Sequence, residues 1–379
     1  DPDRIGGFVS PLPLERVSSL CTFKDGIRSQ ALMTPHALHT VLVLRLSSIG
    51  DIILTTPFLR AFKRRHPDCA LHYVVRNEYA ELLRDNPFID RLITVDVTEG
   101  RRGLEALNLS LNAVHYDAVF DLHNHLRTRI VRNGLSANMH HVNKRSLRRL
   151  LLVGLHANFY GPVVPVSERY IETAARYGVR ADADGPELFL SSETRHAVER
   201  RFRLDGVDSS RALIGLCPGA RHFTKRWPRE RYAALAGALA ERGQQVLLFG
   251  AKEDAGLRET LPAHVRPAVF EYCGEFSLLE TAAAMEHCTA VVANDSGLMH
   301  LATAVRRPVV ALFGSTVREF GFFPYNSPAS VLEVQDLACR PCTFIGRASC
   351  PRGHFRCMRA IDVPDVLDAL DTLTAAVAP

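Results

Sequence analysis

The chain has 379 residues, of which 47% are hydrophobic and 23% are charged, and its formal net charge is +5. This composition is typical of a soluble globular protein, and the length allows two domains of ordinary size. No apolar stretch approaches the roughly 18–20 residues of a membrane-spanning helix, so a membrane-spanning protein is not expected. Residues 1–37 do not resemble a signal peptide, which favours a poorly ordered extension and a cytoplasmic protein.

Patterns typical of strands and helices alternate through the first half of the chain, which predicts a parallel α/β architecture. Strands are predicted at residues 41–46, 71–75, 92–96 and 117–121. Helices are predicted to begin near residues 55, 78 and 103, and another is predicted at 167–177. Residues 180–186 (RADADGP) have turn composition and predict the approach to a linker.

The same alternation begins again in the second half, so we expect two successive doubly wound units with a crevice between them. Strands are predicted at residues 213–216, 245–249, 290–293 and 308–313. Helices are predicted at residues 192–203, 229–242 and 277–288, and from residue 296. The apolar tail, residues 363–378, predicts a final helix.

The turn at residues 47–51 (SSIGD) follows the first predicted strand, at a place where ligands bind in open parallel sheets. It contains no glycine-rich phosphate-binding motif, and a carboxylate repels phosphate. Asp51 is therefore better suited to accept a proton or a hydroxyl hydrogen bond. The alternative is that Asp51 only caps its helix, and the turn alone does not decide between the two.

A basic segment without any acidic residue runs from Leu122 to Ser167. Its lysine and arginine residues include Arg127, Arg129, Arg132, Lys144, Arg145, Arg148 and Arg149. Such a segment attracts an anion, either an acidic membrane surface or a phosphorylated or carboxylated substrate. Nucleic acid is not the expected partner, because aromatic residues are few here and no nucleic-acid-binding motif is recognised. The alternative is a solvated face without a partner.

Three turns of the second unit follow predicted strands and combine small residues with hydroxyl or charged groups. They are Pro218-Gly219 with Thr224 and Lys225, Asp295-Ser296-Gly297 with His300, and Gly314-Ser315-Thr316. Because the carboxyl ends of parallel strands share one edge of a sheet, these turns together predict a nucleoside-diphosphate site. His300 could equally be a hydrogen-bonded core residue. In a fourth turn, Glu253 or Asp254 could accept the hydroxyl groups of a ribose.

Four motifs, in their order and spacing, make the chain resemble the heptosyltransferases of glycosyltransferase family nine, enzymes of lipopolysaccharide core assembly. The motifs are SSIGDIILTTP, PGARHFTKRWP, NDSGLMHLA and ALFGST. The resemblance runs from about Val41 to the C-terminus. It implies an α/β GT-B fold, in which an acceptor-binding Rossmann-like domain (38–185) and a nucleotide-sugar-binding one (186–360) face a central cleft. The helix at 361–379 is implied to return to the first domain.

The resemblance also implies transfer of L-glycero-D-manno-heptose from ADP-heptose to a lipopolysaccharide inner-core acceptor, with inversion and without a catalytic metal. Asp51 matches the proposed catalytic base, and Lys225 matches the lysine that stabilises the leaving ADP. Asp295 matches an aspartate that binds heptose hydroxyls, and Glu253 is a looser match to a ribose-binding glutamate. Other expected donor-binding residues are Pro218, Gly219, Thr224, Ser296, Gly297, His300, Gly314, Ser315 and Thr316. Residues expected to bind an anionic acceptor at the inner membrane surface are Ser48, Gly50, Arg127, Arg129, Lys144 and Arg145.

Four cysteines lie within one short segment: Cys339, Cys342, Cys350 and Cys357. Four thiolates at this spacing are a candidate tetrahedral site for a structural zinc or iron, and some relatives in the family carry iron on four cysteines. A metal here is expected to be distant from Asp51. The alternative is that reduced thiols pack in a proline- and glycine-rich loop.

Other functions fit alternating β/α units as well. A nicotinamide oxidoreductase is disfavoured because its glycine fingerprint is missing. A catalytically silent binding module is disfavoured by the presence of Asp51, Lys225 and Asp295 together. A nucleotide-sugar epimerase or hydrolase, and a heptosyltransferase that acts on a protein, stay open as alternatives.

Overall fold

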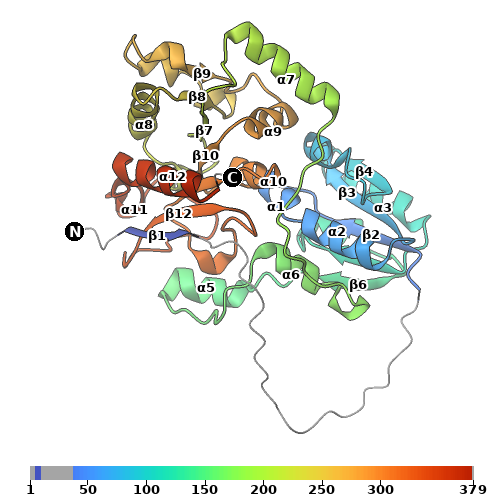
Figure 1. Cartoon of the computed structure of the whole chain (residues 1–379). Helices are drawn as coiled ribbons and strands as arrows, with labels where there is room; N and C mark the ends of the chain where they lie inside the picture. The colour runs from blue at the N-terminus through green and yellow to red at the C-terminus, as the bar shows by residue number, and fades with distance from the viewer. Residues whose placement is uncertain (1–4, 10–36, 378–379) are drawn as a thin grey trace, which may run out of the picture.

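The protein consists of two α/β lobes that face each other (Figure 1). A computed structural model describes residues 5–9 and 37–377. The N-terminal lobe is built on a five-stranded sheet and the C-terminal lobe on a seven-stranded sheet. Helix α7 (Ser192–Asp205) follows the segment that joins the two lobes.

The N-terminal lobe has a fully parallel sheet in the order β4-β3-β2-β5-β6. Its strands are β2 (Thr40–Leu44), β3 (Ala70–Arg76), β4 (Arg91–Val95), β5 (Ala118–Asp121) and β6 (Asn138–His141). Its helices are α1 (Ile49–Ile53), α2 (Thr56–Arg65), α3 (Gly100–Asn112), α4 (Leu126–Val131), α5 (Ser146–Leu155) and α6 (Val166–Glu172), with the 3-10 turns η2 (Asn77–Leu83) and η3 (Ala175–Tyr177). The strand order reverses at β2, so the turn after β2 lies where ligands bind in such sheets.

The C-terminal lobe has the sheet order β1-β12-β11-β10-β7-β8-β9, in which only β1 (Ile5–Val9) is antiparallel to its neighbour. Its other strands are β7 (Leu213–Cys217), β8 (Gln245–Leu248), β9 (Val269–Glu271), β10 (Ala290–Asn294), β11 (Val309–Phe313) and β12 (Ala329–Val334). Besides α7, its helices are α8 (Arg229–Glu241), α9 (Leu278–Glu286), α10 (Gly297–Ala304), α11 (Arg356–Arg359) and α12 (Val363–Val377). Its 3-10 turns are η4 (Phe223–Lys225), η5 (Lys252–Asp254), η6 (Arg258–Thr260), η7 (Arg266–Ala268) and η8 (Arg318–Phe320). Here the order reverses between β7 and β10, and the turns after both strands face the other lobe.

The two lobes meet where the first turns of α1 and α10 approach each other. A Cβ atom added at Gly50 would lie 2.5 Å from His300 Cδ2, and one added at Gly297 would lie 2.9 Å from Ile49 Cβ. Both positions therefore need glycine for the close approach of the two helices. The apolar core beneath is continuous across this junction, because buried residues of both lobes belong to one cluster.

Two expectations about the ends of the chain are wrong. Helix α12 does not return to the N-terminal lobe, because Val366 and Leu370 pack with Tyr232 and Leu235 of α8 in the core of the C-terminal lobe. The apolar face of α12 packs against the sheet at β11 and β12, and this contact buries it. Residues 5–9 are not without structure, since β1 supplies the hydrogen bonds that the edge strand β12 would otherwise lack. The rest of the expected extension lies outside the described residues.

Candidate active site

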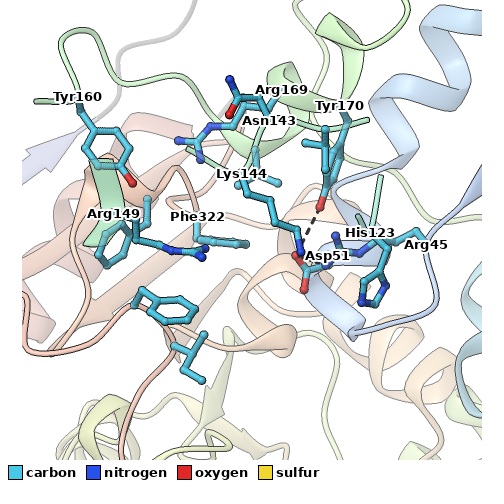
Figure 2. Close-up of a pocket in the computed structure, with 15 residues that line it drawn as sticks. Arg45, Asp51, His123, Asn143, Lys144, Arg149, Tyr160, Arg169, Tyr170 and Phe322 are labelled. Atoms are coloured by element: carbon cyan, nitrogen blue, oxygen red, sulfur yellow. Dashed lines mark hydrogen bonds and ion pairs between the residues drawn. The ribbon is translucent and has the colours of Figure 1, made fainter. Parts of the chain in front are cut away.

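Asp51 lies in the first turn of α1, and both of its carboxylate oxygens are held. Oδ2 accepts hydrogen bonds from the Ser48 hydroxyl at 3.0 Å and the Ser48 backbone N–H at 3.5 Å. Oδ1 lies 2.7 Å from Arg45 Nη2 and accepts a hydrogen bond from the Tyr170 hydroxyl at 3.4 Å (Figure 2). Asp51 thus takes part in capping its helix. Its side chain is still 21% exposed, and it lines the cleft between the lobes.

The surroundings of Asp51 keep it ionised. Burial alone would raise the pKa of Asp51, but the charge of Arg45 and the hydrogen bonds from Ser48 outweigh that effect and lower the pKa below its ordinary value. The neighbouring His123 is uncharged at neutral pH, because burial and the charge of Arg45 lower its pKa to about 3. Asp51 is therefore a carboxylate, ready to accept a proton or a hydrogen bond.

Arg45 is a site residue that sequence reasoning missed. It directly follows β2 and is buried. Its guanidinium donates hydrogen bonds to the carbonyl oxygens of Leu122 at 2.7 Å and Ser47 at 2.8 Å, and these bonds fix its position beside Asp51. The sequence feature that could have identified Arg45 is its position as a charged residue at the end of an otherwise apolar strand.

On the other lobe, Lys225 and Asp295 form a second charged centre. The Lys225 ammonium lies 2.7 Å from Asp295 Oδ2, and the Thr316 hydroxyl donates to the same oxygen at 2.6 Å. These residues follow β7, β10 and β11, so the strand ends that were predicted to converge do so. Ser296 and Gly297 at the start of α10 lie beside them. The buried Ser296 hydroxyl has no hydrogen-bond partner among the described residues, which leaves it able to bind a ligand.

Two adjoining pockets form one cleft with Asp51 at their junction. The first, here called the lysine pocket, is lined by Asp51, Ser48 and Gly50 from the N-terminal lobe and by Lys225 and its neighbours from the C-terminal lobe. The second, here called the arginine pocket, is drawn in Figure 2. Both pockets share Asp51 and one apolar wall, formed by Phe320, Phe322, Phe344 and Ile345.

The arginine pocket gathers cations around the exposed edge of Asp51. Its basic lining residues are Arg45, Lys144, Arg149 and Arg169. Burial and the charges of Arg45 and Arg149 lower the pKa of Lys144, and burial and the charge of Arg145 lower the pKa of Arg169 to about 10. The cations thus repel one another, and a bound anion would relieve this repulsion. Of the basic residues expected to bind an acceptor, only Lys144 lines this pocket: Arg127 and Arg129 are exposed on α4, and Arg145 lies beside the pocket lining.

Several predicted donor-binding residues support the lysine pocket without lining it. The buried Thr224 hydroxyl accepts a hydrogen bond from the Arg347 backbone N–H at 2.9 Å, and the Gly314 carbonyl accepts one from Arg340 Nε at 2.7 Å. The Ser315 hydroxyl is buried without a partner among the described residues. Pro218 and Gly219 are buried in the turn after β7.

The turn after β8 contains the two acidic residues that were considered for a ribose, Glu253 and Asp254. Asp254 lies against the turn after β7, because a Cβ atom added at Gly219 would come within 2.0 Å of Asp254 Oδ2. Glu253 is exposed and does not line either pocket. His300 is buried and lines the lysine pocket, and burial lowers its pKa to about 4, so it is neutral at physiological pH.

Comparisons with known proteins identify the family. The family model described as glycosyltransferase family 9 (heptosyltransferase) matches residues 104–349, more than half of the chain. The chain belongs to glycosyltransferase family 9. It is 32% identical over 299 residues to lipooligosaccharide heptosyltransferase 2 of Haemophilus influenzae, a match that covers 74% of this chain and 84% of that protein. The predicted family and enzyme class are therefore confirmed: this family 9 enzyme is a glycosyltransferase.

Solved structures confirm the predicted GT-B fold of this family 9 enzyme. A glycosyl transferase family 9 protein from Veillonella parvula is similar with a TM-score of 0.74 and 25% identity, over 89% of this chain and 97% of that one. ADP-heptose lipopolysaccharide heptosyltransferase II of E. coli is similar with a TM-score of 0.67 and 26% identity, over 89% of this chain and 98% of that one. In the part of the chain that the structure describes, no helix is long and apolar enough to cross a membrane.

The cysteine segment, residues 339–357, departs from the expectation of a structural metal. Within residues 5–9 and 37–377, no group of three or more His, Cys, Asp or Glu side chains is suited to hold a metal ion, so a structural zinc or iron is not supported. The four thiols are free, and Cys339 Sγ lies 3.7 Å from His354 Nε2. Phe344 and Ile345 of the same segment line both pockets.

Proposed function

We propose that this family 9 enzyme transfers L-glycero-D-manno-heptose from ADP-heptose to a hydroxyl group of a lipopolysaccharide inner-core acceptor, with inversion of the anomeric centre. The observation that carries the proposal is that Asp51 of one lobe and the Lys225–Asp295 pair of the other line a single pocket. Such a transfer needs a base for the attacking hydroxyl and a cation for the leaving diphosphate. The relatives from Haemophilus influenzae and Salmonella typhimurium are named as lipooligosaccharide and lipopolysaccharide heptosyltransferases, which supports the choice of sugar and acceptor. The similar structure from E. coli is named for ADP-heptose, which supports the choice of donor.

The lysine pocket is the proposed site of the donor. The Lys225 ammonium, the unpaired Ser296 hydroxyl and the free N–H groups at the start of α10 are suited to the diphosphate. When the donor binds, Lys225 turns from Asp295 toward the phosphate oxygens. Asp295 is then free to accept hydrogen bonds from heptose hydroxyls.

Asp51 is the proposed general base. The acceptor hydroxyl oxygen forms a bond to the anomeric carbon, the bond from that carbon to the diphosphate oxygen breaks, and ADP leaves with the electron pair. The hydroxyl becomes strongly acidic as the new bond forms, so a carboxylate with a lowered pKa can take its proton late in the step. Arg45 and Tyr170 hold Asp51 in position, while Lys225 stabilises the charge that develops on ADP.

The arginine pocket is the proposed site of the acceptor. Lys144, Arg149 and Arg169 line it beside Asp51 and are suited to phosphate or carboxylate groups. An inner-core acceptor carries such groups and is anchored in lipid. The enzyme is therefore proposed to act at the cytoplasmic surface of the inner membrane.

Replacement of Asp51 by Asn tests the proposal. ADP release from ADP-heptose would be measured with and without a deacylated, water-soluble inner-core acceptor. Wild-type protein should release ADP only with the acceptor, and Asp51→Asn should lower that rate by about 10²–10⁴-fold, because a general base contributes about this much. Binding of ADP, measured by calorimetry, should not change.

The exposed Asp68 provides a matched control, since Asp68→Asn should keep the wild-type rate. Near-normal transfer by Asp51→Asn would refute the assignment of the base. ADP release that needs no acceptor would instead identify a hydrolase or an epimerase.

A further inference from the structure

Helix α5 carries large apolar side chains on its outer side. Leu147, Leu150 and Leu155 are 69%, 66% and 72% exposed, and Phe159, just beyond the helix, is 61% exposed. At about 100° per residue, the three leucines fall within an arc of about 140° on one face of the helix. A surface helix ordinarily buries such a face against the core. Among the described residues, nothing covers it here.

The exposure is not due to loose attachment of α5. Leu152, which lies outside this arc, is buried and packs with Tyr160 and with Phe320 of the C-terminal lobe. The Arg149 guanidinium lies over the ring of Phe344, 4.0 Å from its centroid. The helix therefore lies at the rim of the molecule beneath the C-terminal lobe, as Figure 1 shows, with a fixed inner face.

The charge around the exposed leucines is positive. The segment from Leu122 to Ser167 has no acidic residue, and Arg132 is its only member that forms a salt bridge within the described residues. Arg148 lies between the exposed Leu147 and Leu150 in the sequence. From the other lobe, the acidic Glu319 contacts this segment and accepts a hydrogen bond from Asn158.

Exposed leucines beside cations such as Arg148 and Arg149, which form no salt bridge within the described residues, suit an anionic bilayer. Apolar side chains of an interfacial helix enter the boundary between headgroups and acyl chains, while arginine and lysine bind the lipid phosphates. A protein partner of comparable fit would need acidic groups around an apolar groove. The segment has no acidic residue that would repel anionic lipid. Its positive charge therefore favours an anionic bilayer as the partner.

We propose that Leu147, Leu150, Leu155 and Phe159 form a docking surface that inserts into an anionic membrane. The inference rests on the proposed function, in which the acceptor is anchored in lipid. The same helix supplies Arg149 to the lining of the arginine pocket. Docking through its outer face would therefore place that pocket at the bilayer surface, where the polar head of the acceptor lies.

The test compares two double variants of equal charge. Leu147→Glu/Leu150→Glu changes the docking surface, and Leu109→Glu/Leu204→Glu changes leucines that are 73% and 84% exposed on α3 and α7. Cosedimentation would be measured with vesicles of phosphatidylglycerol and phosphatidylcholine, and with vesicles of phosphatidylcholine alone. Wild-type protein and the control should bind the anionic vesicles, more weakly at high salt. The docking variant should bind them at least about tenfold more weakly, because it loses apolar insertion and gains repulsion.

Activity separates this inference from the proposed function. With a deacylated, water-soluble acceptor, the docking variant should keep the wild-type rate and the wild-type thermal transition, because the two leucines are exposed. With the acceptor in vesicles, its rate should fall in parallel with binding. Equal vesicle binding by the wild-type protein and the docking variant would overturn the inference. It would also be overturned if the wild-type protein formed a dimer that the docking variant abolished, since the surface would then serve self-association.

Discussion

Replacing Arg45 by Gln should move the acidic limb of the kcat/KM–pH profile to higher pH. The Arg45 Nη2 and Asp51 Oδ1 atoms lie 2.7 Å apart, and the two side chains are only 10% and 21% exposed. A hydrogen bond to a charged group in such a place contributes about 1.5–3 kcal/mol, and about 1.4 kcal/mol corresponds to one pKa unit. Since burial would no longer be opposed by this charge, the pKa of Asp51 should rise.

The direction of the effect follows from the role of Asp51 as a base. Activity is present when the carboxylate is ionised and is lost as the pH falls through its pKa. In the wild-type enzyme this pKa is below its ordinary value, so activity persists to lower pH than it would with an ordinary aspartate. In Arg45→Gln the loss should begin at higher pH, and activity should therefore fall more at pH 5 than at pH 7.

The assay is ADP release with a water-soluble acceptor across the pH range in which the protein stays folded. Arg45→Lys keeps a positive charge and should shift the limb less. Arg132→Gln breaks a comparable ion pair with Asp121 in the same lobe and should leave the limb in place, which controls for general destabilisation. An Arg45→Gln protein with a native thermal transition and an unchanged acidic limb would refute the reasoning.

Two further substitutions test the other lobe and the junction between the lobes. Lys225→Ala should lower kcat by about 10²–10³-fold, because one preorganised group that stabilises the leaving charge contributes about this much; an unchanged kcat with a raised KM would show that the lysine only binds the donor. Gly50→Ala places a Cβ atom 2.5 Å from His300 Cδ2, so it should cost about 1–3 kcal/mol of stability and lower activity. Gly237→Ala, where no atom lies within 4 Å of the added Cβ, should have neither effect, and an equal loss in both variants would contradict the argument from close approach.

Much of the fold could be predicted from local patterns. Strands such as β2, β10 and β11 are continuous apolar runs, and their periods and bounding turns are visible in the sequence. The elements that no prediction covered include the short α4, which spans six residues and gives no helical period to recognise. Helix α5 was missed as well, inside a segment noted only for its charge.

Part of the candidate site could also be predicted from the sequence. Asp51, Lys225 and Asp295 stood out because each follows a strand, and the carboxyl ends of parallel strands converge. Glu253 on η5 and Arg127 and Arg129 on α4 line neither pocket, and their expected roles stay predictions. Their segments follow strands, as the segments of Asp51 and Lys225 do. The direction of each side chain, however, depends on how its turn or helix packs.

By itself, the sequence determined the chemical groups, the alternation of strands and helices, and the motif order that marks family 9. Only the tertiary structure decided which groups meet: Tyr170 reaches Asp51 from a position 119 residues away, and Phe344 of the cysteine segment lines the cleft. The same holds for α12, whose apolar stripe fits either lobe until the available surface is known. Local periodicity reports which face of an element is apolar, whereas contacts between distant segments depend on the shape and burial of the surface that each one finds.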